Sequence, residues 1–318
     1  MSPQTKQIAR IIFRNKILEA NAQEYENLFT KVMGYSRSDF QPVKPQGAFG
    51  DRKNDGFEKN SGRYFQVFAP EDSSTKETKA IRKINEDFKG LHDYWQSQGV
   101  GIREFHFVLN DKFKGAYPST DFALNELKKN YPTLQVSEKF LAKHLENEFF
   151  LLSDDQIFVI IGGVPDPENI ETIDYGVLGE VIKFIDQQPT KPFEVGKLVA
   201  PPFDKKITFN GLVGTKSFLE NAWYQCGVLD SYFEFEGDFT KDFLRDKLNS
   251  VYVEAREKFA NPPTLDSGDQ IFISILENII PSGINSVDNK RYREAAGVLM
   301  ATFFDSCDIY EEPEIGLS

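Results

Sequence analysis

The stretch "GAFGDRKNDGFEKNSGRYFQVFAPED", Gly47–Asp72, is the most informative part of the chain. Its segments "DGFEK" and "RYFQVFA" predict the two strands of a hairpin around the turn "KNSG". Side chains alternate between the two faces of a strand, so Tyr64, Gln66 and Phe68 share one face of the second strand. The other face carries Phe65, Val67 and Ala69. The hairpin therefore combines a polar position with an otherwise apolar strand.

Oxygen-bearing side chains in and before this hairpin predict a divalent metal site. Asp55 opens the first strand, Gln66 lies on the second, and adjacent strands are about 5 Å apart. Mg²⁺ prefers oxygen ligands and keeps several waters, so two or three protein ligands suffice. The backbone carbonyl of Val67 can add a ligand, and Glu26 can add a carboxylate from the rim of the preceding helix. Mn²⁺ is the alternative ion.

Two neighbouring positions are expected to support this site. Asp51 lies in the loop before Asp55, and Gly56 leaves room beside Asp55 for a phosphodiester. A metal held in this way activates water and stabilises charge on a scissile phosphate. The alternative is that Asp51, Asn54, Asp55 and Gly56 simply form turns, since Asn, Asp and Gly are turn-forming residues.

The flanking sequence predicts an α/β arrangement in the first half of the chain. Helical periodicity covers residues 5–19, and a second helix begins near Asn21, which forms a capping box with Glu24. A long helix follows the hairpin, with a capping box of Ser74 and Glu77, and the strand "REFHFVLND" comes next. Two shorter helices are expected at about 119–129 and 138–149, followed by a strand at "QIFVIIG".

The second half of the chain predicts helices almost throughout. Apolar residues repeat at helical spacing in four segments, at about 218–226, 239–259, 271–280 and 291–304. The segment "GGVPDPEN", Gly162–Asn169, has two glycines and two prolines and marks the best boundary. We therefore expect two domains, an α/β domain at 1–163 and a helical domain at 164–318.

Charge divides along the same boundary. Residues 1–163 carry 23 Lys and Arg against 22 Asp and Glu, a net charge of +1. Residues 164–318 carry 14 against 27, a net charge of −13. An acidic surface repels nucleic acid, so any contact with a phosphate backbone is assigned to the first half. The acidic half is interpreted either as a solvated surface or as a docking face for partners.

Composition places the protein in the cytoplasm, without a membrane segment. No apolar run approaches the roughly 18 residues that span a bilayer, and the N-terminus lacks the pattern of a signal peptide. Cys226 and Cys307 lie in apolar surroundings and are interpreted as reduced core cysteines. No P-loop motif occurs, so the chain is not expected to hydrolyse nucleotides itself.

The motif "GDRKNDGF…YFQVFAPE" resembles the glycine-rich signature of Mrr-like restriction endonucleases of the PD-(D/E)xK nuclease superfamily, and "QEYENLF" resembles their glutamate-bearing helix. The resemblance implies a restriction-endonuclease-like core, a mixed sheet flanked by helices, that hydrolyses DNA with Mg²⁺. It implies that Asp55, Gln66 and Glu26 are catalytic metal ligands and that Asp51 supports them.

The chain departs from that family at one position. The family has a lysine two residues after the Gln, where this chain has Phe68. Lys53, in the loop next to Asp55, is the first candidate to replace that lysine as the cation that positions water. Lys76, Lys79 and Lys83 on the following helix remain alternatives.

The same front motif, with the tail "VLMATFFDSCDIYEEP", resembles the effector subunits of Lamassu-type bacterial defence systems, a branch of the ABC-three-component systems. This resemblance implies an SMC-like ABC ATPase and a small third subunit as partners, with possible homo-oligomers. The predicted function is a DNA endonuclease effector controlled by those partners in antiphage or anti-plasmid defence. The alternatives are an inactive nuclease-like interaction subunit and an RNA-directed nuclease.

Overall fold

The computed structural model divides into two compact units. It describes residues 1–43, 54–70, 76–98, 101–167, 173–189, 203–236, 241–260, 264, 266–306 and 309–311. The α/β unit comprises Lys16–Ile160, and the helical unit comprises Met1–Asn15 with Ile161–Ser318. The second boundary lies within three residues of the expected one. The first fifteen residues, expected in the α/β domain, cluster instead with the helical unit.

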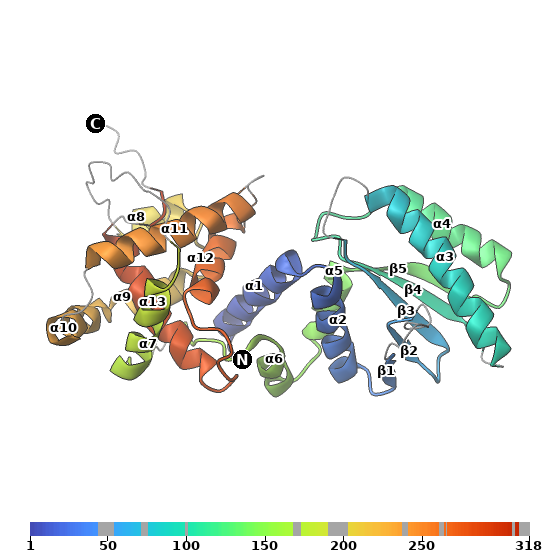
Figure 1. The fold of residues 1–318 in the computed structure, drawn as a ribbon, viewed down its shortest axis with the longest axis horizontal. Helices are drawn as coiled ribbons and strands as arrows, with labels where there is room; N and C mark the ends of the chain where they lie inside the picture. Colours follow the sequence, from blue (N-terminus) through green and yellow to red (C-terminus); the bar gives the residue numbers. More distant parts are fainter. Residues whose placement is uncertain are drawn as a thin grey trace. The chain divides into compact units, whose positions relative to one another are not determined.

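A five-stranded mixed sheet forms the centre of the α/β unit (Figure 1). Its strands occur in the order β1-β2-β3-β4-β5. β2 is antiparallel to both β1 and β3, whereas β3, β4 and β5 are parallel. The strands are β1 (Phe40–Pro42), β2 (Gly56–Glu58), β3 (Arg63–Phe68), β4 (Glu104–Leu109) and β5 (Val136–Leu141). The hairpin expected from the sequence is therefore confirmed as β2 and β3, joined by a turn in which Gly62 has a φ of +66°.

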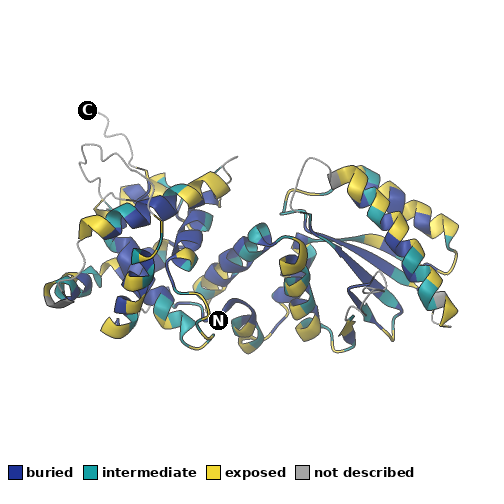
Figure 2. Ribbon diagram, viewed as in Figure 1, coloured by how far each residue is buried: buried dark blue, intermediate teal, exposed yellow. Residues whose placement is uncertain are grey.

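Helices cover both faces of this sheet. α2 (Ala22–Ser36) and α5 (Ala142–Phe149) lie on one face, and α3 (Lys76–Ser97) and α4 (Pro118–Asn130) lie on the other (Figure 1). On the α2 face, the rings of Phe29 and Phe65 are 5.5 Å apart. On the α3 face, Tyr64 lies 5.4 Å from Trp95. Figure 2 shows the strands buried between these layers. Successive residues of β3 thus point to different helix layers, as the alternation predicts.

The end of the α/β unit differs from the sequence expectation. The segment "QIFVIIG", expected as a strand, belongs to the helix α6 (Asp154–Ile161), and the strand next to β4 is formed earlier, by Val136–Leu141. A short apolar run does not distinguish a buried strand from a buried helix. Here the helix start is determined by polar capping, because Ser153 Oγ accepts from the Gln156 N–H at 3.3 Å and Gln156 Oε1 accepts from the Ser153 N–H at 2.9 Å.

The described part of the helical unit contains no strand, as expected. Four of its helices match the four apolar repeats of the second half: α9 (Lys216–Trp223), α11 (Lys241–Phe259), α12 (Ser267–Asn278) and α13 (Asn289–Asp305). The others are α7 (Tyr175–Asp186), α8 (Phe203–Phe209), α10 (Cys226–Glu236) and most of α1 (Pro3–Glu19). Buried Arg293 bonds Glu277 and the carbonyls of Ile161 and Gly163, which fixes α13 against the start of the unit.

None of the described helices combines the length and apolar character needed to cross a membrane. Cys226 is a free thiol of intermediate exposure, and burial raises its pKa to about 11. The second cysteine, Cys307, lies outside the described residues.

Candidate functional site

Asp55 lies directly before β2 and is bonded to β3. Its Oδ2 accepts a hydrogen bond of 2.5 Å from the backbone N–H of Val67 and another of 2.8 Å from Nε2 of Gln66. Its own backbone N–H donates to the carbonyl of Phe65 at 3.0 Å. The side chains of Asp55 and Gln66, predicted to converge from two strands, are therefore in direct contact.

The amide oxygen of Gln66 is buried and has no hydrogen-bond partner within the described ranges. Gln66 is 3% exposed and Asp55 is 6% exposed, so both side chains are shielded from solvent. The Gln66 amide nitrogen faces the carboxylate, and its Oε1 has no partner among the described residues. Buried polar atoms are almost always paired, and each exception requires an explanation. Any partner of this oxygen has to be a hydrogen-bond donor or a cation, because an amide oxygen only accepts.

Gly56 supports the hairpin for a different reason than expected. A Cβ built at Gly56 would lie 2.3 Å from Cζ of Phe40, far inside a normal contact. The space beside Gly56 is thus filled by the ring of Phe40 on β1 and is not available for a phosphodiester. Asn54 Oδ1 accepts from the Gly56 N–H at 3.1 Å, which adds an Asx turn at the same point.

Glu26 is not in contact with the Asp55–Gln66 pair. It is half-buried on α2, the helix that packs on the Phe65 face of β3, whereas Gln66 alternates to the α3 face. Within the described residues, no hydrogen bond or ion pair joins Glu26 to Asp55 or Gln66. The carbonyl of Val67 lies 3.5 Å from Nε2 of Gln66. Asp51 and Lys53, the remaining predicted residues, lie outside the described residues.

A cationic hollow lies on the α3 face of the sheet at the end of β3. Its volume is about 220 Å³, and its lining comprises Phe68, Lys79, Arg82, Lys83, Glu86 and Asp87. Lys79 and Lys83, two of the three helix lysines that remained alternatives for the missing cation, line this hollow. The side chain of the third, Lys76, lies outside the described part of the structure. Asp87 was not predicted. A carboxylate among the apolar positions Ile84, Phe88 and Leu91 was the available signal.

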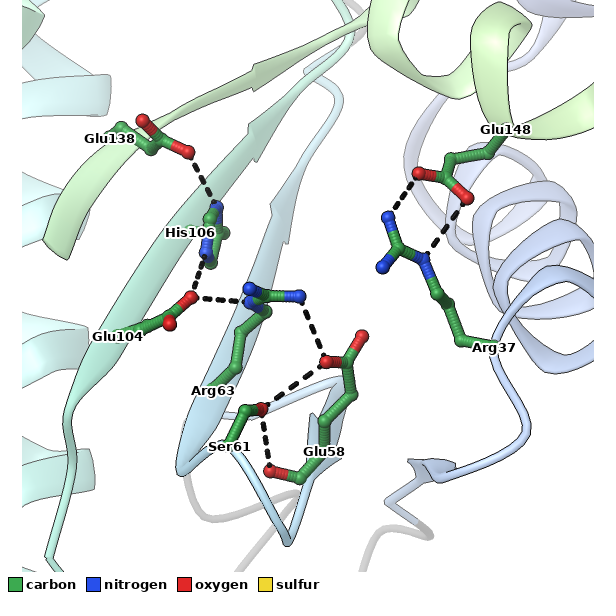
Figure 3. A network of polar contacts seen from close by, with 8 residues as sticks. All are labelled: Arg37, Glu58, Ser61, Arg63, Glu104, His106, Glu138 and Glu148. Atoms are coloured by element: carbon green, nitrogen blue, oxygen red, sulfur yellow. Dashed lines mark hydrogen bonds and ion pairs between the residues drawn. The ribbon is translucent and has the colours of Figure 1, made fainter.

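A second polar network lies on the opposite face, at the other end of the strands (Figure 3). Arg63 bonds Glu104 at 2.5 Å and Glu58 at 2.9 Å, and His106 lies between Glu104 at 3.3 Å and Glu138 at 3.4 Å. Burial lowers the pKa of His106, although both carboxylates act against it. Burial likewise raises the pKa of Glu58 despite its contact with Arg63. This network connects β2, β3, β4 and β5.

Neither polar cluster is a ready-made histidine, cysteine or carboxylate metal centre. Within the ranges that the structure describes, no three such side chains come close enough together to hold an ion. A cation at Asp55 would therefore depend on the amide oxygen of Gln66, backbone oxygens and waters. The Gln66 side chain, which contacts the Asp55 carboxylate through Nε2 and whose Oε1 has no partner among the described residues, fits that requirement.

Comparison with known proteins gives a family match for part of the helical unit. No curated protein and no solved structure matches the chain. Residues 177–311 match the family model of C-terminal domain 10 of the ABC-three component (ABC-3C) systems. The match covers the helices from α7 to α13 and supports membership of a system of this kind and a role in defence.

Proposed function

We propose that the α/β unit is a metal-dependent endodeoxyribonuclease of the PD-(D/E)xK type, and that the chain is the effector subunit of an ABC-three-component defence system. The observation that carries the proposal is the contact between the Asp55 carboxylate and the Gln66 amide, in which Gln66 Oε1 is buried and has no partner in the part of the chain that the structure describes. Two side chains that carry oxygens of the types that Mg²⁺ prefers are thus in contact on neighbouring strands.

The order of elements supports the proposal. A helix, three antiparallel strands, a second helix and a parallel strand follow one another as α2, β1, β2, β3, α3 and β4. This is the order that the resemblance to restriction-endonuclease-like nucleases implies. The residue pair lies where β2 begins and in the middle of β3, which are the positions of the motif in that family.

The chemistry of the site follows from these groups. Bound Mg²⁺ or Mn²⁺ would supply a Lewis acid and an activated water. Asp55 and Gln66 would hold the ion through Oδ and Oε1, and the backbone N–H of Val67 would keep the carboxylate in place. In the hydrolysis, water adds to phosphorus and the bond from phosphorus to the leaving ester oxygen breaks. The water loses one proton to solvent, and the leaving oxygen gains one.

The helical unit accounts for control of this activity. Its match to an ABC-three-component C-terminal domain supports docking to an SMC-like ABC ATPase and a small third subunit. Its sequence is strongly acidic, so it does not favour DNA and leaves nucleic-acid contact to the α/β unit.

The test uses the full chain, alone and with any ATPase and third subunit encoded beside it. Supercoiled plasmid is incubated with Mg²⁺ and either the wild type, Asp55→Asn or the control Asp93→Ala, which changes a carboxylate on α3 that is 64% exposed. We expect cleavage by the wild type and the control and none by Asp55→Asn. In calorimetry, Mn²⁺ should bind the wild type and not Asp55→Asn. Equal cleavage and equal Mn²⁺ binding by all three would refute the proposal.

A second candidate is a non-catalytic interaction subunit that keeps the nuclease-like core. Two observations favour it: Phe68 occupies the family's lysine position, and Asp55 is 6% exposed with its carboxylate bonded to Gln66 and Val67. This candidate predicts no Mn²⁺ binding that depends on Asp55 and no cleavage in the presence of the partners. RNA added to the same assay distinguishes an RNA-directed enzyme.

A further inference from the structure

A nuclease at Asp55 and Gln66 needs a positive side chain close to the phosphate. Charge develops on the phosphoryl oxygens during attack, and pre-positioned cations that face this charge give a large part of the rate. Position 68 of β3 lies two residues after Gln66 on the same face, about 7 Å further along the strand. It carries an apolar ring that contacts Phe107 at 5.7 Å, so the strand itself supplies no cation there.

Lys83 reaches this place from the neighbouring helix. The hollow beside Phe68 is lined by Lys83 on α3, which covers the face of the sheet to which Gln66 points. α3 runs back along β3: Trp95 lies at the level of Tyr64, 5.4 Å away, and Lys83 lines the hollow with Phe68 at the other end. Lys83 therefore lies on the Gln66 side of the sheet, at the end of β3.

Asp87 holds Lys83 in this position. The Nζ of Lys83 lies 2.6 Å from Oδ2 of Asp87, one helical turn away, and the Asp87 side chain is 4% exposed. A buried carboxylate is stable only with a charged or hydrogen-bonding partner. The Lys83 side chain is accordingly 32% exposed, whereas Arg82, its neighbour on the helix, is 68% exposed. The ammonium of Lys83 is thus held against Asp87 at the lining of the hollow.

The other two cations of the hollow differ from Lys83. Arg82 pairs only at 4.0 Å, with the exposed Glu86, and Lys79 is exposed. Exposed cations along a groove contact phosphates on either side of a reacting bond and add affinity without directing chemistry. Lys79 and Arg82 fit that role.

We propose that Lys83, positioned by Asp87, is the cation of the nuclease site, and that Lys79 and Arg82 make the hollow a subsite for the adjoining phosphodiester. This proposal rests on the function proposed above. Two independent features coincide on one face of the sheet: Gln66, whose Oε1 has no partner among the residues described, and the ammonium held by a buried carboxylate. Lys83 thus takes the place of the lysine that β3 lacks.

The test compares Lys83→Ala with Lys89→Ala, which removes the same charge from an exposed position of the same helix. Plasmid cleavage with Mg²⁺ is measured under single-turnover conditions, with the same subunits that are needed for cleavage by the wild type. The cleavage rate of Lys83→Ala should be about 100-fold or more below that of the wild type. Binding of a short duplex is measured with Ca²⁺ in place of Mg²⁺, so no turnover is needed. In this binding assay, Lys83→Ala should reduce the slope of the logarithm of the binding constant against the logarithm of the salt concentration by about one, which corresponds to one lost phosphate contact. Lys89→Ala should change neither quantity.

Asp87 is tested as a positioning residue by a double-mutant cycle. Asp87→Asn alone should slow cleavage by about 10-fold. Added to Lys83→Ala it should cause no further loss, because its effect acts through Lys83. Mn²⁺ binding should remain in all of these variants and thermal unfolding confirms that each is folded.

The outcomes separate the two proposals. If Lys83→Ala behaves as Lys89→Ala in both cleavage and DNA binding while Asp55→Asn loses Mn²⁺, the lysine assignment is wrong and the nuclease proposal stands. If Asp55→Asn keeps full Mn²⁺ binding and cleavage, the nuclease proposal itself fails. Additive losses in the Asp87 cycle would overturn the positioning role.

Discussion

Removal of the Asp55 carboxylate should destabilise the α/β unit by an amount that depends on the replacement. In Asp55→Ala, the Val67 N–H and the Gln66 Nε2 both lose their acceptor in a buried place. A buried donor without a partner costs about 1 to 3 kcal/mol, so the expected loss for the two donors is about 2 to 6 kcal/mol.

Asp55→Asn should cost much less. Its amide oxygen can take the place of Oδ2 and still accept from both the Val67 N–H and the Gln66 Nε2. We expect a loss of about 1 kcal/mol or less, which makes Asp55→Asn the better variant for all tests of metal binding.

Tryptophan fluorescence can measure the unfolding of the α/β unit separately from that of the helical unit. The chain has two tryptophans: Trp95 on α3, 5.4 Å from both Phe57 and Tyr64, and Trp223 on α9 of the helical unit. In a Trp223→Phe background, urea unfolding followed by the emission of Trp95 reports on the hairpin. The hydrogen-bond argument would be refuted if Asp55→Ala lowered the free energy of unfolding by less than about 0.5 kcal/mol, or if Asp55→Ala and Asp55→Asn lowered it equally.

Three further predictions concern the fold around the site. Gly56→Ala should cost about 1 to 3 kcal/mol in the same urea assay, because its Cβ would meet the Phe40 ring at 2.3 Å, and Phe40→Leu should recover part of that loss. Phe65→Ala should cost about 3 to 5 kcal/mol, since its ring packs on Phe29, Phe40 and Phe140, whereas Phe122→Ala, at a position 69% exposed, should stay within about 0.5 kcal/mol. Burial lowers the pKa of His106 below the ordinary 6.5, so the neutral ring stabilises the folded state above pH 6.5 and this contribution is lost as the pH falls through the lower folded value. His106→Gln should therefore make the stability of the α/β unit fall less steeply between pH 7 and pH 5, and an unchanged slope would contradict this.

Local signals were sufficient to predict the hairpin and most helices. The alternation of "RYFQVF" predicted which β3 side chains share a face, and the rings of Tyr64 and Phe65 lie on different helix layers as expected. Periods of two and about four residues are properties of the chain itself, so they can be read without knowing what packs on them. The same logic predicted the contact of Asp55 with Gln66.

The choice between helix and strand in short apolar segments could be made only from the tertiary structure. Residues 154–161 form a helix where a strand was expected, and the fifth strand lies at Val136–Leu141 instead. In both segments the sequence is compatible with either state, and the state is selected by pairing with β4 or by capping at Ser153. The assignment of Met1–Asn15 to the helical unit likewise depends on long-range contacts, such as the hydrogen bond from Asn15 to the Gln270 carbonyl.

The sequence by itself determined that Asp55 and Gln66 come together on neighbouring strands of the hairpin, because strand alternation and cross-strand spacing are local geometry. Only the tertiary structure decided that Phe40 fills the space at Gly56, that Glu26 has no contact with the pair, and that Lys83 with Asp87 lies beside Phe68. Those facts depend on how α2 and α3 pack on the two faces of the sheet. Packing is decided by the summed burial of distant side chains, and no motif along the chain encodes it alone.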